Sequence, residues 1–440
     1  MGNGARGTGP LGRRFWTLWS ATSISSVGDG LALAALPLLA VTLTGNALAV
    51  AAVVTVQTLP WLVVAVPVGA LADRMDRVTA MVAADVARAV VMAMVAALVL
   101  LGGMTMPALY ALAFALGLFE TLGVAAAQAT IPSLAGPERL ARANSYLVAS
   151  ENTGGHFAGP AVGGIVFAAG RMLPFAADAA SFLGSAGLLS TLRPGSRDRR
   201  HPALTSAPAA SPSTGAASGP APPLARPRTS FGSDMAAGLT FFRSSRLLPM
   251  LAAMTAGLAF MQAMVMAPFV LFALRDLGLS QAGYGLFLGV TSLGNVAGSL
   301  AAPWARARLG TGWLLFSSGV LAALAYLAVA TTSSVGWALV AFLVEAFAVA
   351  CGSVASVTLR QRHIPPELLG RVSNVFRTAI WGAVPVGALV GGVLAQHLGL
   401  RAPFLVAGAA QVVLALAVGL PLERRTRRAE APDCQAGRER

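Results

Sequence analysis

The chain has 440 residues, of which 56% are hydrophobic and only 11% are charged. Soluble domains carry about 25% charged residues, so this composition excludes a soluble globular protein, and it also excludes a disordered or collagen-like chain. All 31 basic residues are Arg and the formal net charge is +14, which on charge alone would be compatible with nucleic-acid binding.

Twelve apolar stretches follow one another along the chain, and each is long enough to cross a bilayer as a helix of about 20 residues. Most show no strand-like alternation, and backbone groups in lipid must bond within their own segment, so we expect helices. The first stretch follows Arg13 and Arg14, but it continues to Thr42 and is too long for the apolar core of a twin-Arg signal peptide. The stretches are 15–42, 48–71, 78–101, 106–131, 144–169, 173–192, 247–274, 282–304, 312–331, 335–360, 374–397 and 402–421.

The sixth and seventh stretches are separated by a segment of different composition. Residues 193–230 are dominated by Pro, Ala, Ser and Gly and cannot bury a core, so we expect a flexible cytosolic linker. Residues 231–246 suggest a short amphipathic helix on the membrane, with the Phe241–Phe242 pair in apolar surroundings. The predicted units are an N-terminal six-helix bundle (1–192), the linker (193–230), the amphipathic segment with a C-terminal six-helix bundle (231–421) and a cytosolic tail (422–440).

Arginine is distributed unevenly between the two sides that these stretches define. If the N-terminus is cytosolic, the segments on the cytosolic side carry 27 Arg and the outer loops carry three, whereas Arg88 alone lies within a predicted span. This is the positive-inside pattern of membrane proteins. It predicts a multi-pass protein of the cytoplasmic (inner) membrane with both termini cytosolic. The positive net charge then follows from placement of Arg on the cytosolic side of the lipid bilayer, and no nucleic-acid partner is needed to explain it.

The two sets of six stretches resemble each other at offsets of about 230 residues. Ile131-Pro132 recurs as Ile364-Pro365, and Arg171 before Pro174-Phe175 recurs as Arg401 before Pro403-Phe404. Six spans separate the copies, so each segment keeps its orientation. The sequence therefore predicts an all-α membrane protein with twelve transmembrane helices in two parallel six-helix bundles.

The loop after the second stretch reads GALADRMDR over residues 69–77. It resembles the conserved loop of the major facilitator superfamily, roughly G-x-L-A-D-R-x-G-R, but has Asp76 where the pattern has Gly. The matching residues are Gly69, Leu71, Asp73, Arg74 and Arg77. Glycine lets two helices approach closely, and a carboxylate can face the positive N-terminal end of a neighbouring helix. The resemblance implies a gating loop that latches the two halves on the cytosolic side; the alternative is an ordinary Arg-rich turn.

The fifth stretch contains GHFAGPAVGG over residues 155–164. It resembles the G-x-x-x-G-P-x-x-G-G motif of the antiporter branches of the same superfamily. The matching residues are Gly155, Gly159, Pro160, Gly163 and Gly164. Glycines four residues apart form a smooth groove for another helix, and a proline removes one backbone hydrogen bond and bends its helix. The resemblance implies export by antiport, with plain small-residue packing as the alternative.

Three further stretches narrow the resemblance to one branch. Residues 14–30, the pair Asp85 and Arg88, and residues 234–243 are similar to the macrolide-efflux and enterobactin-exporter-like branch. Members of that branch export macrolides, siderophores and other medium-sized amphipathic molecules against protons. The resemblance implies the same class of small-molecule substrate here, with protons as the coupling ion.

Ionisable residues within the apolar stretches need a reason, because a charge at the bilayer centre costs roughly 3 kcal/mol on insertion scales. Asp29, Glu120, Glu345 and His156 fall at middle depths. Arg stays protonated, so a proton carrier must be Asp, Glu or His. Asp29 lies between two glycines that could loosen its helix, and it is the leading candidate, with Glu120 and Glu345 as rivals. His156 is a further candidate, although a histidine in such a position is more often part of a packed core. Each of the four could instead be a satisfied structural polar group.

Asp85 and Arg88 lie three residues apart on one helical face near the cytosolic side. We expect them to pair with each other or with the loop of Asp73, in a structural or gating role. The two cysteines form no disulfide framework, and we find no metal-binding or cofactor motif. A phosphate-binding G-x-x-x-x-G-K-[ST] loop is excluded because the chain contains no Lys.

These observations favour a secondary active transporter over an enzyme. We expect a monomer that exports an amphipathic small molecule, such as a drug, macrolide or siderophore, in exchange for protons. Proton-coupled uptake by symport is the alternative. A membrane sensor or intramembrane enzyme is less favoured, because the sequence contains no recognisable catalytic or metal cluster.

Overall fold

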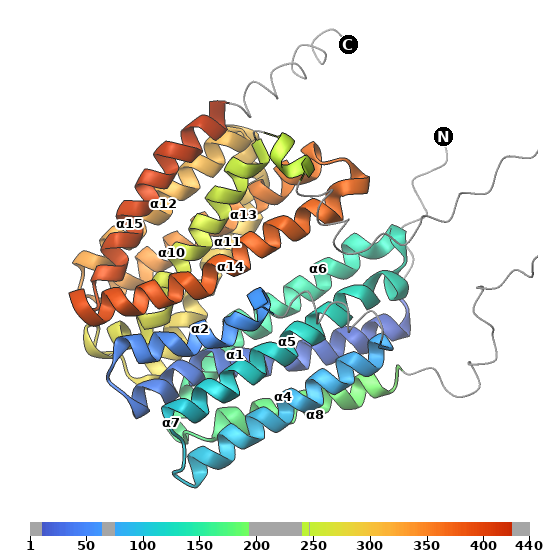
Figure 1. The fold of residues 1–440 in the computed structure, drawn as a ribbon, viewed down its shortest axis with the longest axis vertical. Coiled ribbons are helices and arrows are strands. Elements are labelled where there is room, and N and C mark those ends of the chain that lie inside the picture. The colour runs from blue at the N-terminus through green and yellow to red at the C-terminus, as the bar shows by residue number, and fades with distance from the viewer. Residues whose placement is uncertain (1–10, 64–74, 193–239, 246, 425–440) are drawn as a thin grey trace, which may run out of the picture.

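The computed structural model describes residues 11–63, 75–192, 240–245 and 247–424, and these ranges consist of helices and short connections (Figure 1). The N-terminal half contains α1 (Arg13–Leu43), α2 (Ala47–Val63), α4 (Arg77–Leu100), α5 (Met106–Ala135), the short 3-10 helix η1 (Pro137–Arg139), α6 (Leu140–Ser150), the π-helix η2 (Glu151–Ala158), α7 (Gly159–Ala169) and α8 (Leu173–Ser190). The C-terminal half contains α10 (Leu247–Arg275), α11 (Gln281–Leu309), α12 (Thr311–Thr331), α13 (Val335–His363), α14 (Pro366–Leu398), α15 (Ala402–Leu414) and the π-helix η4 (Ala415–Gly419).

Several predicted features lie outside the described residues. They include the linker at 193–230, the first part of the amphipathic segment and most of the tail. Within the amphipathic segment, residues 240–244 are helical. Phe242 packs edge-on against Phe376 of α14, with ring centroids 5.7 Å apart. This ring therefore contacts the C-terminal half of the protein itself.

Nine of the described helices are long and apolar enough to cross a membrane. α2 is apolar but shorter, with 17 described residues. The stretch expected at 144–169 is not one α-helix: it consists of α6, η2 and α7 in succession. Pro160, the second residue of α7, has no backbone N–H to donate. The N–H of Gly159 reaches back five residues to the carbonyl of Gly154. The antiporter-like sequence thus spans a change in helix type.

Side-chain caps or a glycine turn mark the ends of several helices. Asp76 stands where the family pattern has Gly, and it caps α4 by accepting a 2.9 Å hydrogen bond from the backbone N–H of Thr79. Ser280 caps α11 in the same way through the N–H of Gly283, at 3.0 Å. Gly310 joins α11 to α12 with φ +78°, a conformation that favours glycine. These caps let consecutive helices reverse direction over short connections.

The same helix pairs pack in both halves. In the N-terminal half α1 packs against α7 and α8, α2 against α5, and α4 against α5. In the C-terminal half the equivalent helices do the same: α10 packs against α14 and α15, α11 against α13, and α12 against α13. Between the halves α2 packs on α14, and α7 packs on α11. The packing therefore repeats at the offset seen in the sequence.

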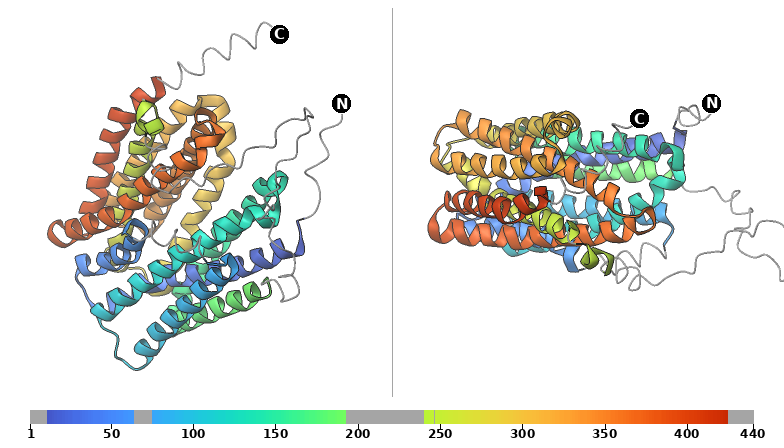
Figure 2. Two further views of the ribbon diagram at one scale, coloured as in Figure 1. Left: turned by 45° about the vertical axis from the view of Figure 1, so that its right-hand side comes forward. Right: turned by 90° about the horizontal axis from the view of Figure 1, so that it is seen from above.

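The two groups of helices diverge in one direction. We call the side on which α1 begins the start side, and the side on which it ends the far side. Figures 1 and 2 show the two groups meeting near the far side and spreading apart towards the start side. On the far side, Gln396 of α14 accepts a 2.9 Å hydrogen bond from the N–H of Ala47, the first residue of α2. Arg275 at the end of α10 donates to the carbonyl of Gly45 at 3.4 Å.

Two pairs of adjacent glycines sit where the halves meet. A Cβ at Gly163 of α7 would lie 2.6 Å from the Leu31 carbonyl oxygen in the same half, whereas one at Gly164 would lie 2.7 Å from Gly285 Cα in the other half. Real side chains do not tolerate such approaches. In α14, Gly391 faces Met264 of its own half, and Gly392 faces Ala51 of α2 in the other half. In each pair, one glycine serves packing within its half and the next serves packing between the halves.

We predict that Gly164→Ala destabilises the protein by about 1–3 kcal/mol, because the added methyl meets backbone atoms that cannot rotate away. Gly187→Ala in α8 is the matched control, since a Cβ there has no neighbour within 4 Å. Unfolding of both variants by SDS in mixed micelles measures the difference. Equal stability of the two variants would contradict the close crossing of α7 and α11.

Candidate functional site

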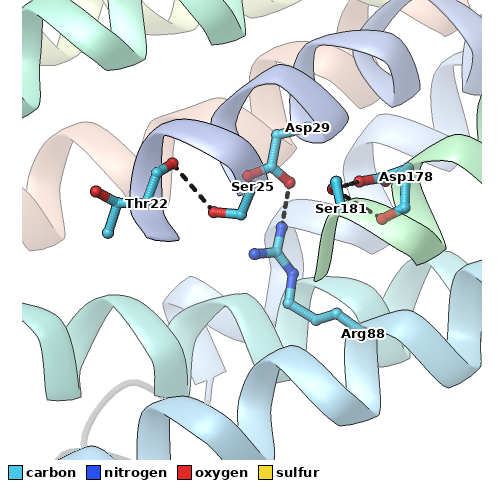
Figure 3. A network of polar contacts seen from close by, with 6 residues as sticks. All are labelled: Thr22, Ser25, Asp29, Arg88, Asp178 and Ser181. Carbon is cyan, nitrogen blue, oxygen red and sulfur yellow. Dashed lines mark hydrogen bonds and ion pairs between the residues drawn. The ribbon is translucent and has the colours of Figure 1, made fainter. Parts of the chain in front are cut away.

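The N-terminal half contains a cluster of charged side chains centred on Arg88 of α4 (Figure 3). The Arg88 side chain is 9% exposed, and its Nη2 donates to Asp29 Oδ1 of α1, which forms an ion pair across two helices. Its guanidinium carbon lies 4.1 Å from the centre of the Phe182 ring of α8. The buried charge is thus compensated by a carboxylate on one side and contacts an aromatic face on another.

Three further carboxyl groups lie within electrostatic range of Arg88. They belong to Asp85 in α4, Glu120 in α5 and Asp178 in α8. Asp85 and Asp178 are buried, and Glu120 is half-buried. One guanidinium cannot neutralise four carboxylates, and Arg keeps its proton. Any change in the charge of this cluster must therefore come from protons gained or lost at its carboxyls.

Serines of α8 bind two of these carboxyl groups. Asp85 accepts a hydrogen bond from Ser185. Asp178 Oδ1 accepts a 3.2 Å bond from Ser181, while Asp178 Oδ2 is buried without a partner (Figure 3). Buried polar atoms without partners are rare, so Asp178 Oδ2 is an unusual unused acceptor. Asp178 is therefore poised to accept a further hydrogen bond or a proton.

Asp29 differs from its neighbours because it is accessible. Its side chain is 41% exposed, although it pairs with a buried Arg. The flanking glycines do not loosen α1, which stays α-helical through residues 28–30. They allow close approach instead: a Cβ at Gly28 would collide with Ser181 and Asp178 of α8, and one at Gly30 would lie 2.7 Å from Gly159 Cα. The Gly-Asp-Gly sequence thus brings two other helices to Asp29.

His156 and the antiporter-like residues border this cluster. His156 is exposed on η2 and lies within electrostatic range of Asp29. Gly155, Gly159, Pro160, Gly163 and Gly164 are buried. A Cβ at Gly159 would lie 2.5 Å from Gly30 Cα, so the motif packs directly beside Asp29. The motif also reaches α11 through Gly164, as described above.

Glu345 lies apart from the charge cluster, in the C-terminal half. It is 5% exposed on α13, and the Tyr326 hydroxyl of α12 donates to its Oε1 at 2.8 Å. The side chains nearby include the aromatic ring of Phe342 one turn away. Of the four predicted proton carriers, Asp29, Glu120 and His156 therefore come together, and Glu345 does not.

Asp85 and Arg88 do not form an ion pair with each other among the described residues, and the other predicted pairing, with the loop of Asp73, lies outside them. Arg88 pairs with Asp29, because the long guanidinium side chain reaches α1 while Asp85 turns to Ser185 of α8. Among the predicted gating residues, Gly69, Asp73 and Arg74 lie outside the described residues. Arg77 donates to the carbonyl of Ala129 at 2.7 Å and so ties the start of α4 to α5.

Asp178 is the member of the cluster that sequence analysis did not select. Its one sequence signal is a carboxyl residue within an apolar stretch, which Glu151 and others share. What distinguishes Asp178 is its contact with the position of Gly28, 150 residues earlier in the chain. That contact depends on how α1 and α8 are rotated against each other, which a single sequence does not contain.

The comparisons with known proteins agree with this architecture. The sequence profile of the Major Facilitator Superfamily matches residues 18–384, with a second match over residues 251–438. The chain belongs to the Major Facilitator Superfamily. Because it belongs to this superfamily and has many apolar helices, the protein is a multi-pass membrane transporter and not an enzyme. Among curated protein sequences none matches the chain.

Solved structures of transporters share the fold. A bacterial homologue of the iron transporter ferroportin in an inward-facing state has a TM-score of 0.69 at 18% identity, covering 93% of this chain and 98% of that one. The nucleoside transporter NupG has a TM-score of 0.68 at 13% identity, covering 93% and 99%. A bacterial homologue of the human lysosomal transporter Spinster, inward-facing and unoccupied, has a TM-score of 0.67 at 14% identity, covering 94% and 96%. At these identities the likeness establishes the fold alone. Within the described residues no group of three His, Cys, Asp or Glu is placed to hold a metal ion.

We predict that Arg88→Gln is more damaging than Asp29→Asn. Removing Arg88 leaves buried carboxyls without a counter-charge, which typically costs about 3–5 kcal/mol, whereas Asp29→Asn leaves three other acidic partners. The double variant should recover part of the loss, because neither partner is then left alone. SDS unfolding of all four proteins measures the coupling, and strictly additive losses would contradict the ion pair.

Proposed function

We propose that this superfamily transporter exports an amphipathic small molecule in exchange for protons. The observation that carries the proposal is the accessible Asp29 paired with a buried Arg88 amid surplus carboxyl groups. Such an arrangement suits proton exchange, because the carboxyl can alternate between ion pairing and protonation while the guanidinium stays charged.

We further propose the full superfamily architecture for the chain: twelve spans in two parallel six-helix bundles, with both termini in the cytosol. The repeated helix pairs support the two bundles. The arginine distribution supports a cytosolic start side. The divergence of the two groups towards that side would then be an inward-facing arrangement, closed on the far side by Gln396 and Arg275.

The route from proton to conformational change would run through glycine contacts. Asp29 is followed by Gly30 and Leu31, which touch Gly159 and Gly163 of α7. In α7, Gly163 is followed by Gly164, which contacts Gly285 of α11 in the other half. Protonation of Asp29 would release Arg88 towards the remaining carboxyls, and a shift of α1 would be passed to the interface between the halves. Alternating access by rocking of the halves requires a link of this kind.

The direction and the substrate class rest on sequence resemblance. The motif at 155–164 resembles antiporter branches, and three further stretches resemble macrolide and siderophore exporters. The structural relatives carry different cargoes, since one is a homologue of an iron transporter and another is a nucleoside transporter. We therefore propose export of a drug, macrolide or siderophore, and we treat uptake by symport as the competing outcome of the test.

The test is retention of dyes, macrolides and siderophores by efflux-deficient cells, with and without this protein and with and without a protonophore. Lower retention that the protonophore restores supports proton-driven export and names the substrate. Higher retention that the protonophore abolishes means uptake. No change for any compound, with the protein present in the membrane, would contradict export of this substrate class.

We predict that Asp29→Asn abolishes transport driven by a pH gradient in proteoliposomes but preserves exchange of labelled for unlabelled substrate, because exchange needs no net proton movement. Glu138→Gln is the matched control, since Glu138 is exposed on η1, and it should transport normally. Full gradient-driven transport by Asp29→Asn would remove Asp29 from the proton-carrier role and leave Glu120, Glu345 and His156 to be tested in the same way.

A further inference from the structure

A second site is formed on the start side of the C-terminal half, away from the charge cluster. A cavity of about 320 Å³ lies between α13 and α14. Its polar lining consists of Arg360 and Gln361 of α13 and Ser373 and Arg377 of α14, and Trp381 contributes an aromatic wall. Every charged residue that lines the cavity is therefore basic.

The two arginines, Arg360 and Arg377, have no carboxylate partner among the residues that the structure describes. The Arg360 Nε is buried without a hydrogen-bond partner, and its guanidinium lies 4.7 Å from the centre of the Phe376 ring. Arg377 Nη1 donates to Gln128 Oε1 of α5 at 3.0 Å, which uses one of its five N–H groups. Both guanidinium groups therefore have N–H donors that no described residue accepts.

The lining selects a particular chemistry. Guanidinium groups bind carboxylates and phosphates through paired N–H donors, and the Ser373 hydroxyl and Gln361 amide add further donors. Trp381 offers a flat apolar surface next to these donors. A ligand with one anionic group and an attached apolar or aromatic body fits both parts of the lining.

Two residues that line the cavity also make contacts between the two halves. Arg377 reaches Gln128 of α5, and Trp381 stacks on Trp61 of α2 with ring centroids 4.8 Å apart and planes 14° apart. These bridges lie on the side towards which the halves spread apart. An anion that attracts the Arg377 guanidinium would compete with Gln128 for it.

We propose that this cavity binds the anionic group, carboxylate or phosphate, of an amphipathic molecule, and that binding weakens the Arg377–Gln128 bridge. The anion is carried either by the transported molecule as it enters or by a phospholipid headgroup. The first source rests on the proposed function, whereas binding itself does not depend on transport.

The experiment uses the full chain in phosphatidylcholine nanodiscs, with phenyl phosphate as the probe in isothermal titration calorimetry. Benzylamine, which has a similar body and the opposite charge, is the ligand control. Arg360→Gln and Arg377→Gln should each weaken phenyl phosphate binding by about tenfold or more, because each substitution removes the hydrogen bonds that a charged guanidinium would donate to the phosphate. Arg362→Gln, at an exposed arginine near the end of the same helix that does not line the cavity, should bind like the wild type.

Gln128→Leu separates binding from bridging. It frees Arg377 from its bond to α5, so phenyl phosphate should bind as tightly as in the wild type or more tightly. If Gln128→Leu loses binding as Arg377→Gln does, Arg377 acts through the bridge and the proposed competition is wrong. The anion site would be overturned if benzylamine bound as tightly as phenyl phosphate. It would also be overturned if Arg362→Gln lost as much phenyl phosphate affinity as the two cavity variants.

A lipid arm distinguishes the two sources of the anion. Nanodiscs containing phosphatidylglycerol should abolish phenyl phosphate binding if a headgroup occupies the cavity, and should leave it unchanged if the site serves a soluble anion. Asp29→Asn should retain a phenyl phosphate site that depends on Arg360 and Arg377, because Asp29 does not line the cavity. Failure of proton coupling in the transport assay therefore leaves this proposal standing, and loss of phenyl phosphate binding leaves proton coupling standing.

Discussion

The permanent charge of Arg88 is the constraint around which the N-terminal half is organised. A guanidinium cannot shed its proton to escape a low-dielectric environment, so the fold must supply counter-charge and hydrogen-bond acceptors. It does so with carboxyls from α1, α4, α5 and α8 and with the ring of Phe182. More carboxyls gather than one guanidinium needs. A purely structural ion pair would require one partner, and the proton exchange that we propose rests on the surplus carboxyls.

Close packing at glycines is the second constraint, because it determines which helices contact the segment of α1 that carries Asp29. Gly28 and Gly30 bring α8 and α7 against α1 on either side of Asp29, and the Gly163–Gly164 pair then joins α1 to α11. The same device recurs at Gly391 and Gly392, where α14 meets α10 and α2. Backbone-to-backbone packing transmits small shifts without the slack of long side chains. A single helix, α7, thus lies between the Asp29 segment of α1 and α11 of the other half.

The apolar stretches predicted from the sequence lie within a few residues of most described helices, since length and hydrophobicity suffice to locate membrane spans. The glycine spacing likewise pointed to close packing at 155–164. The sequence could not supply the partner of Arg88, the π-helical turn at η2 or the stack of Trp61 on Trp381. Each depends on helix rotation and on contacts between residues far apart in the chain, and i,i+3 spacing pointed to Asp85, whereas Arg88 pairs with Asp29.

The two halves share a packing plan but not a chemistry. The N-terminal half concentrates its buried charges around Arg88, whereas Glu345 in the C-terminal half is bound by one tyrosine hydroxyl and lies near aromatic rings. The unpaired donors of the C-terminal half lie instead at the start side, around Arg360 and Arg377. Because both regions contact the interface between the halves, protons and an anionic ligand would act on the same rocking motion from different halves. With such a division, protons and the anionic ligand both shift the same equilibrium between two conformations. Exchange of one ligand for the other requires this shared equilibrium.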